Sequence, residues 1–219
     1  MTTAPGTSNG QRRRTEATRR ALLAAARSVL VEHGYTRATV AQIARAARRA
    51  HGTFYLYFDN KEDIYSRLLE NMWTGLKEES RDIWRPDVPL KSVRVTVDRY
   101  VSAFAENVDL WRLLDEMSAT NPRFQEIRDD TRREFTRKIQ RGIESSLNQA
   151  DVGSMRTEIM AELLAGMVDE GCSALFLRGR SWPREDLVDH IVTIWGRAVG
   201  YTSPGGVDDD GSDPDDTPA

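Results

Sequence analysis

The stretch that most constrains the fold of this chain runs from Ala38 to Asn60 and reads ATVAQIARAARRAHGTFYLYFDN. Thr39 followed three residues later by Gln42 is the pattern of a helix N-terminal capping box, so we expect a helix to begin there. Apolar residues then recur at the spacing of one helix face. These apolar positions are Val40, Ile43, Ala44 and Ala47.

A turn near Arg48 and Arg49 should separate this helix from a second one, predicted from about Ala50 to Phe58. Phe54 and Phe58 lie one helical turn apart and should both point inward. The residues left to face outward are His51, Gly52, Thr53, Tyr55 and Tyr57. Two short helices joined by a tight turn form a helix-turn-helix, in which the second helix enters the major groove of DNA while the first crosses the backbone.

Charge is distributed unevenly along the chain. The net charge is −3, yet residues 1–53 hold ten arginines against two glutamates. Residues 207–219 hold six aspartates and no basic residue. A basic segment attached to an acidic remainder is typical of a polyanion-binding module joined to a second function.

Several classes of protein are disfavoured by what the sequence does not contain. The single cysteine, Cys172, excludes an intramolecular disulfide and a cysteine-cage zinc site. No apolar run approaches the roughly 18 residues needed to span a membrane, and the N-terminus has no apolar core of a signal peptide. We therefore expect a cytoplasmic protein without a membrane partner.

Helical patterns account for the rest of the chain, and we expect an all-α protein of about nine helices. The segment VRVTV at residues 93–97 alternates in a way that also suits a strand. We interpret it as helix, because the residues around it also fit a helical face and no partner strand is evident. Besides the two short helices, the predicted helices span residues 12–33, 61–84, 91–104, 108–118, 122–148, 155–178 and 181–200.

Composition divides the chain into four parts. Residues 1–10 are small and polar, and residues 201–219 are rich in Pro, Gly and Asp, so both should be disordered. Residues 11–60 contain the helix-turn-helix, at about 38–58, and are called the head from here on. Residues 61–200 form a larger helical part, which we call the body. With 219 residues the chain is long enough for both parts to bury a core.

The segment from about Arg14 to Leu69 resembles the DNA-binding domain of the TetR (tetracycline repressor-like) transcriptional regulators. The run G-T-F-Y-x-Y-F at residues 52–58, followed at this spacing by N-K-E-D at 60–63, is long and specific. Further matching residues are Gly34-Tyr35, Thr39-Val40 and Ile43-Ala44.

Four residues depart from the family pattern. Arg48 and Arg49 stand where the family usually has Gly-Val, and Ala50 and His51 stand where Ser and Lys are common. If Arg48 adopts the left-handed conformation of a glycine, the strain costs about 1 kcal/mol or more. Arg49 either lays its stem over the gap between the helices or marks a turn that is built differently.

The resemblance implies how the head would contact DNA. His51, Gly52 and Thr53 would face base edges, and the missing side chain of Gly52 would let the backbone approach the duplex. The arginine run at residues 12–14 is either a solvated flank or an arm that reaches into a groove. Residues implied to bind or neutralise phosphates are Thr39, Arg48, Arg49, Tyr55, Tyr57 and Lys61.

The resemblance also implies that the body forms a homodimer and binds a small, fairly apolar effector. The last two long helices would pack against their symmetry mates, and the operator would be an inverted repeat. We expect the helix that begins at Lys61 to carry motion from body to head, because it touches both. Candidate pocket residues are Trp73, Trp84, Tyr100, Phe104, Trp111, Met117, Phe124, Met160 and Met167, although each alone could simply fill a core.

Two other functions compete with that of a ligand-responsive repressor. A helical-bundle oxidase needs Glu-x-x-His pairs, but the residues three positions before His33, His51 and His190 are Leu30, Arg48 and Leu187. We therefore expect no catalytic residue, no metal site and no cofactor. The second alternative, a helix-turn-helix protein that has become a protein-interaction module, stays open. The pair Arg48-Arg49 is the only feature in its favour.

Overall fold

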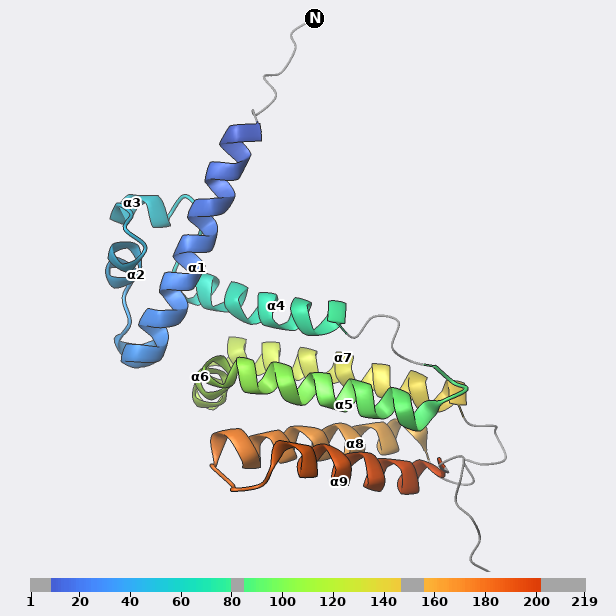
Figure 1. Ribbon diagram of the computed structural model, residues 1–219. Coiled ribbons are helices and arrows are strands. Elements are labelled where there is room, and N and C mark those ends of the chain that lie inside the picture. Colours follow the sequence, from blue (N-terminus) through green and yellow to red (C-terminus); the bar gives the residue numbers. More distant parts are fainter. Residues whose placement is uncertain (1–8, 80–84, 147–155, 202–219) are drawn as a thin grey trace, which may run out of the picture.

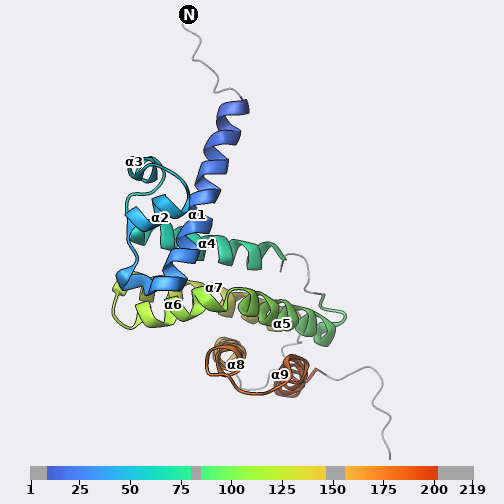
Figure 2. The same ribbon diagram turned by 60° about the vertical axis from the view of Figure 1, so that its left-hand side comes forward.

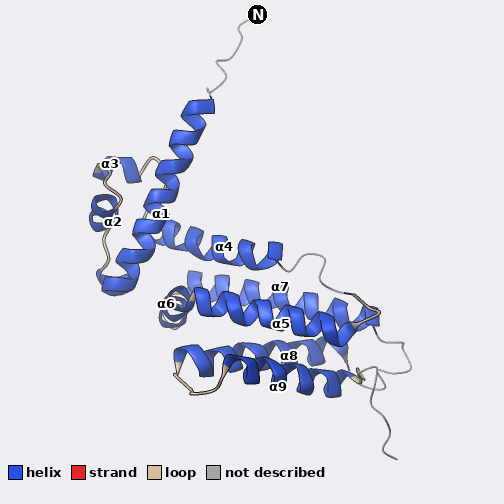
Figure 3. Cartoon of the chain, in the orientation of Figure 1, coloured by secondary structure: helices blue, strands red, loops and turns tan. Residues whose placement is uncertain are grey.

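The computed structural model describes residues 9–79, 85–146 and 156–201, and within these ranges it contains helices and no strand (Figures 1 and 3). The all-α prediction is therefore confirmed. The helices are α1 (Asn9–Arg37), α2 (Val40–Ala46), α3 (His51–Phe54), α4 (Lys61–Glu79), α5 (Pro89–Glu106), α6 (Val108–Ser118), α7 (Pro122–Ser146), α8 (Thr157–Cys172) and α9 (Arg184–Val199), and a π-helical turn, η1 (Ser173–Leu177), continues α8.

Short-range capping signals explain where several helices begin. The hydroxyl of Thr39 accepts the Gln42 N–H at 3.2 Å, while the Gln42 side chain accepts the Thr39 N–H at 2.8 Å, which is the predicted capping box of α2. The side-chain oxygen of Asn60 accepts the N–H three residues later at 2.9 Å. Asn121 accepts the N–H two residues later at 3.0 Å, and Pro122 opens α7 as expected.

Two glycines mark helix ends because they adopt positive φ, which costs other residues strain. Gly34 has φ 74° and interrupts the helical backbone of α1 three residues before its end. Gly200 has φ 77° and directly follows α9. The ambiguous VRVTV segment lies inside α5, where Val93 and Val97 are both buried one turn apart. The helical interpretation of that segment is confirmed.

Some predicted bounds were wrong. Helix α1 begins at Asn9 instead of residue 12, so residues 9 and 10 are not disordered. Helix α3 ends at Phe54 instead of Phe58, because the chain turns back through Tyr55–Tyr57 to bury both phenylalanines. Helix α8 becomes π-helical after Cys172. Predictions for residues 1–8, 80–84, 147–155 and 202–219 lie outside the described residues.

The body is built in layers beneath the head. Figures 1 and 2 show α5 and α7 in one layer, with α8 and α9 in a second layer on the far side from α1–α3. Helix α4 crosses between the head and the first layer. The body core joins residues of α5, α7, α8 and α9, among them Val101, Ile143, Val168 and Ile191.

Head and body meet in a second core rather than across a loose linker. Tyr65 of α4 is fully buried there and donates a hydrogen bond to the Leu110 carbonyl of α6 at 3.2 Å. Its ring lies 5.0 Å from that of Phe124 on α7 and 5.6 Å from that of Tyr35, which precedes α2. Burial raises the pKa of Tyr65, so its phenol stays protonated and keeps donating.

Arg27 of α1 fastens the same junction from the other side. Its guanidinium donates to both carboxylate oxygens of Asp109, at 2.7 and 2.6 Å, and to Asn107 at 3.1 Å. It also donates to the carbonyl of Glu106 at 2.9 Å. Arg27 therefore contacts every part of the connection between α5 and α6. The planar bidentate pairing with the carboxylate fixes the orientation of the guanidinium.

Replacing Asp109 by Asn should lower the free energy of unfolding by about 1 kcal/mol at pH 7. Burial raises the pKa of Asp109, but the hydrogen bonds and charge of Arg27 outweigh burial and hold it below the usual value. The carboxylate thus stabilises the fold above about pH 4, and this stabilisation disappears as the pH falls through the folded-state pKa. Urea unfolding from pH 7 down to pH 2.5 should show the difference from the wild type shrinking toward zero.

Asp189→Asn is the matched control, because Asp189 pairs with Arg94 at 2.5 Å on an exposed surface. We expect that variant to change the free energy of unfolding by less than about 0.5 kcal/mol. Equal effects of the two substitutions would contradict a special role for the Arg27–Asp109 pair.

Candidate DNA-binding surface and ligand cavity

The predicted DNA-contacting residues gather on the outer surface of the head, at α3 and the turns beside it. Figure 2 shows α3 on the side of the head away from α8 and α9. His51, Gly52 and Tyr55 are exposed, whereas Thr53 and Tyr57 are half-buried. Phe54 and Phe58 fill the core behind them, as expected. Whether these outward residues contact DNA stays a prediction.

Gly52 has no packing role inside the chain. A Cβ atom built at this position would meet nothing within 4 Å, and the backbone there is helical. The neighbouring rings of His51 and Tyr55 lie edge to face at 5.4 Å and frame this open position. The space at Gly52 is therefore available to a partner that approaches the backbone of α3.

The turn between α2 and α3 is built with Arg48 in the left-handed conformation, at φ 54°. Arg48 N–H bonds the Arg45 carbonyl at 3.0 Å, and Arg49 N–H bonds the Ala44 carbonyl at 2.9 Å. The guanidinium of Arg49 donates to the Arg48 carbonyl at 3.1 Å, and both side chains are exposed. The turn thus keeps the backbone shape of a Gly-containing turn while presenting two cations to solvent.

Lys61 occupies a different place from the one the resemblance implies. Its ammonium donates to the carbonyls of Tyr35 at 2.5 Å, Ala38 at 2.9 Å and Thr36 at 3.4 Å, and it lies 4.4 Å from the centre of the Tyr35 ring. Burial lowers its pKa. An ammonium has three donors, so Lys61 binds the start of α4 to the segment around the end of α1 and has no donor left for a phosphate. We therefore leave it out of the proposed DNA contacts.

A cavity of about 880 Å³ lies within the body. One part of its wall is aromatic: Trp111 stacks on Phe104 at 4.6 Å and meets Trp73 edge to face at 4.7 Å. Tyr100 stacks on Phe135 at 4.8 Å along the same wall. A cavity of this size and composition is typical of a small-molecule site.

Four of the nine predicted pocket residues line this cavity, namely Trp73, Tyr100, Phe104 and Trp111. Phe124 lies in the core that head and body share, and Met117 packs against it. Met160 and Met167 belong to the body core instead. Trp84 lies outside the described residues.

Sequence patterns did not reveal the polar wall of the cavity, which comes mainly from α7. Arg132 donates to Glu162 at 2.6 Å and lies 3.4 Å from Asp169, whose other oxygen accepts the Tyr100 hydroxyl. Burial raises the pKa of Asp169 and raises that of Tyr100 well above its usual value. Other missed lining residues are Arg128, Phe135, Lys138, Arg141, Leu177 and Trp195. The basic residues among them alternate with acidic residues along α7 as on any solvated helix, so the sequence carried no signal for this polar wall.

Neither a metal cluster nor a membrane-spanning helix is found in the part of the chain that the structure describes. No group of three His, Cys, Asp or Glu side chains there could hold a metal ion. None of the helices in residues 9–79, 85–146 and 156–201 is both long and apolar enough to cross a bilayer.

An outward-facing helix-turn-helix on a helical body with its own cavity defines the class of DNA-binding transcriptional regulators. A family model described as bacterial regulatory proteins of the tetR family matches residues 22–68. The head and the start of α4 therefore match the region that this family model describes.

Individual proteins are similar to larger shares of the chain. The fatty acid metabolism regulator protein of Bacillus subtilis (strain 168) is 33% identical over 90 residues, which span 41% of this chain and 46% of that protein. The HTH-type transcriptional repressor DhaR of Mycobacterium sp. (strain GP1) is 23% identical over 168 residues, 76% of this chain and 84% of that protein. The solved structure of FadR from Bacillus subtilis in complex with stearoyl-CoA has the same fold, with a TM-score of 0.65 and 21% identity over 84% of this chain and 99% of that one.

Replacing Arg48 by Gly should raise the free energy of unfolding by up to about 1 kcal/mol, because the left-handed strain is removed and only part of that gain is offset by the flexibility of glycine. Arg45→Gly is the control: Arg45 lies in the last turn of α2, where glycine should destabilise by about 1 kcal/mol. Urea unfolding of both variants measures the two changes. Destabilisation by both would show that the turn at Arg48 is not strained.

Proposed function

We propose that this regulator is a ligand-responsive repressor that binds an inverted-repeat operator as a homodimer and is released by an effector with an apolar chain. The observation that carries the proposal is that α6 both contacts the head and lines the cavity. Asp109 holds Arg27 of the head, Leu110 accepts the bond from Tyr65, and Trp111 lines the cavity. Three consecutive residues thus connect both functions.

On DNA, α3 would enter the major groove. His51, Gly52 and Thr53 would face base edges, because they lie on the outer side of α3. The hydroxyls of Tyr55 and Tyr57 would bind phosphates and fix the register. The start of α2 at Thr39 and the exposed Arg48 and Arg49 would complete the contact with the backbone.

The dimer would form through α8 and α9. Ile159 and Leu163 of α8 are 51% and 70% exposed, and Ile194 of α9 is 52% exposed. These apolar side chains lie in the layer farthest from the head (Figure 1), and large exposed apolar residues that cluster favour an interface. A twofold dimer would present two α3 helices to major grooves about 34 Å apart.

A fatty acyl-CoA is the effector class that we assign to the cavity. The aromatic wall around Phe104 and Trp111 would take the acyl chain. Basic residues of α7, which stand among acidic lining residues and of which Arg128 pairs with Asp115 at 3.0 Å, would turn to an anionic head group. The structurally similar FadR was solved with stearoyl-CoA, which supports the same class here. Burial of a long apolar chain is worth about 0.8 kcal/mol per methylene, so most of the affinity would come from the tail.

Release requires that the effector favour one arrangement of the dimer over another. Moving the population from almost all DNA-binding to almost all released takes about 5.5 kcal/mol of differential affinity. Helix α4 was expected to carry this motion, and it does join Lys61 at the head to Trp73 at the cavity. Helix α6 provides a second route, because an effector against Trp111 would act directly on the anchors of Arg27 and Tyr65.

Alanine at Thr53, Tyr55 and Tyr57 together should abolish binding to a duplex selected from a random library by the wild-type chain. These side chains are exposed or half-buried, so the fold should persist, which circular dichroism and the unfolding midpoint would verify. Fluorescence anisotropy measures the affinity. Undiminished, sequence-selective binding by the folded triple variant would refute the assignment of α3 as the reading element.

Replacing Trp111 by Leu should raise the concentration of stearoyl-CoA needed for half-release of DNA about tenfold, since it removes the ring that stacks on Phe104. DNA affinity without effector should stay within about twofold of the wild type. Trp182→Leu is the control, because Trp182 is 48% exposed and does not line the cavity. If stearoyl-CoA fails to release DNA from the wild type, or if both variants respond alike, the acyl-CoA assignment to this cavity is wrong.

A further inference from the structure

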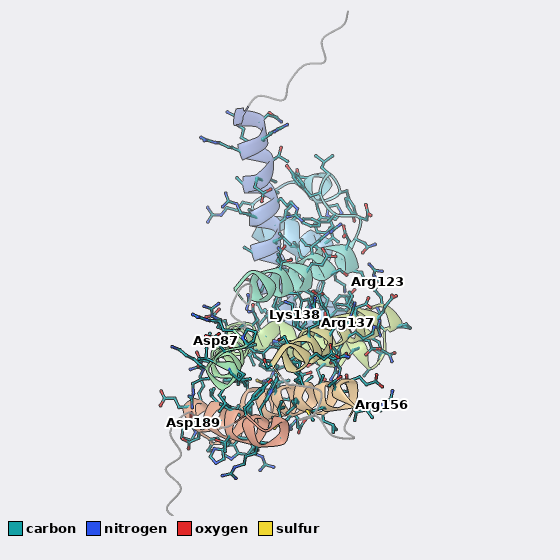
Figure 4. All side chains as sticks on the ribbon, turned by 90° about the vertical axis from the view of Figure 1, so that its right-hand side faces the viewer. Asp87, Arg123, Arg137, Lys138, Arg156 and Asp189 are labelled. Carbon is teal, nitrogen blue, oxygen red and sulfur yellow. The ribbon has the colours of Figure 1, made fainter. Side chains whose placement is uncertain are left out.

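The first turns of α1 extend beyond the rest of the head. Leu22 is the first residue of this helix that is fully buried, and residues 11–17 are exposed throughout. Figures 1, 2 and 4 agree that this end of α1 projects past α3, on the side away from the body. At 1.5 Å per residue, about 20 Å of helix separates Asn9 from Leu22. Packing within the described chain does not account for this projection.

Four arginines of this projection share one helix face. Residues separated by seven or eight positions lie on the same side of a helix. We call Arg12, Arg13, Arg19 and Arg20 the arginine stripe; Arg14 points to the opposite side by the same geometry.

The contact of Arg19 shows which way the arginine stripe faces. Its guanidinium carbon lies 5.8 Å from the centre of the ring of Phe58, four residues after the end of α3. The side of α1 that holds Arg19 therefore faces the segment that follows α3. Arg12 and Arg13 lie about 9 to 11 Å further along the same helix face, in the part of α1 that projects past α3.

The electrostatics of the projection are unfavourable in the free protein. Its first turn contains no acidic residue, and Glu16 is the only acidic residue in the first 31 positions. Cations near the positive end of the helix dipole are destabilising, and neighbouring like charges repel one another. A polyanion placed along the stripe would relieve both effects.

We propose that the arginine stripe is a second DNA contact, separate from α3, which binds phosphates that flank the groove entered by α3. This inference rests on the proposed DNA-binding function and adds to it an element outside the helix-turn-helix. Phosphate contacts carry no base information, so the stripe raises affinity for every sequence alike. It also lengthens the stretch of duplex that one head covers.

The test compares two triple variants of the full chain that change charge equally. The stripe variant is Arg12→Gln, Arg13→Gln, Arg20→Gln, which spares Arg19 because it packs on Phe58. The control is Arg14→Gln, Arg133→Gln, Arg137→Gln. Arg14 is on the other side of α1, and Arg133 and Arg137 belong to α7, where Figure 4 shows Arg137 within the body. Anisotropy is measured from about 50 to 300 mM salt with a library-selected duplex and with an unrelated duplex of the same length.

The stripe variant should bind both duplexes at least about tenfold more weakly at 150 mM salt, with their affinity ratio unchanged. The plot of log affinity against log salt should become shallower by about 0.9 for each phosphate that is no longer neutralised, or about 1 to 3 per bound head. The control should match the wild type, and Arg12→Lys, Arg13→Lys, Arg20→Lys should keep the wild-type slope. The unfolding midpoint of each variant verifies folding.

Three outcomes would overturn the inference in distinguishable ways. If the stripe variant keeps the affinity and slope of the wild type, the stripe does not touch DNA, while the proposed function stands. An equal loss of affinity in the control would likewise show a nonspecific effect of net charge. If the wild type selects no duplex from the library at all, the proposed DNA-binding function fails first.

Discussion

The structure depends above all on the contact of α1, α4 and α6, where the buried Tyr65 meets Leu110 and the partly buried Arg27 meets Asp109. Without it the head would be a small helical unit on a linker, and its orientation would not depend on the body. Tyr65 is fully buried and its hydroxyl donates to Leu110, so any arrangement that separates α4 from α6 leaves a buried donor unsatisfied. The head therefore takes its orientation from α6.

The same constraint explains why a cavity in the body can matter to DNA. Trp111 follows Leu110 directly, and its ring forms part of the cavity wall against Phe104 and Trp73. A ligand that presses on this ring acts on the residue next to the anchor of the head. Packed cores respond to such pressure by moving between discrete arrangements rather than deforming smoothly. In the proposed mechanism, a small displacement at α6 would therefore produce a larger change in the position of α3.

The sequence predicted those features of the fold that depend on residues close together in the chain. The capping box at Thr39, the cap at Asn60 and the helix end at Gly34 are each decided within about four residues, and all three were found as expected. The left-handed Arg48 was one of the alternatives left open by a family pattern that has glycine at the same place, and the structure shows it.

What could not be predicted depends on contacts across the fold. Phe124 and Phe135 are both apolar residues of α7. Phe124 fills the core that head and body share, whereas Phe135 lines the cavity. Lys61 was expected on phosphate, but three carbonyls of the preceding segment take its donors. Sequence spacing places a residue on a helix face; the packing partner of that face is decided by the whole chain.

The central claim is that α6 couples the cavity to the orientation of the head, and the distance between the two heads of a dimer tests it most directly. Ser28 is exposed on α1 and, through Ser28→Cys, would carry a spin label, while the buried Cys172 stays unlabelled. Pulsed electron paramagnetic resonance would measure the label-to-label distance with and without stearoyl-CoA. We expect the effector to shift this distance in the wild type and to shift it less in the Trp111→Leu variant. An unchanged distance at a stearoyl-CoA concentration that releases DNA would contradict the account.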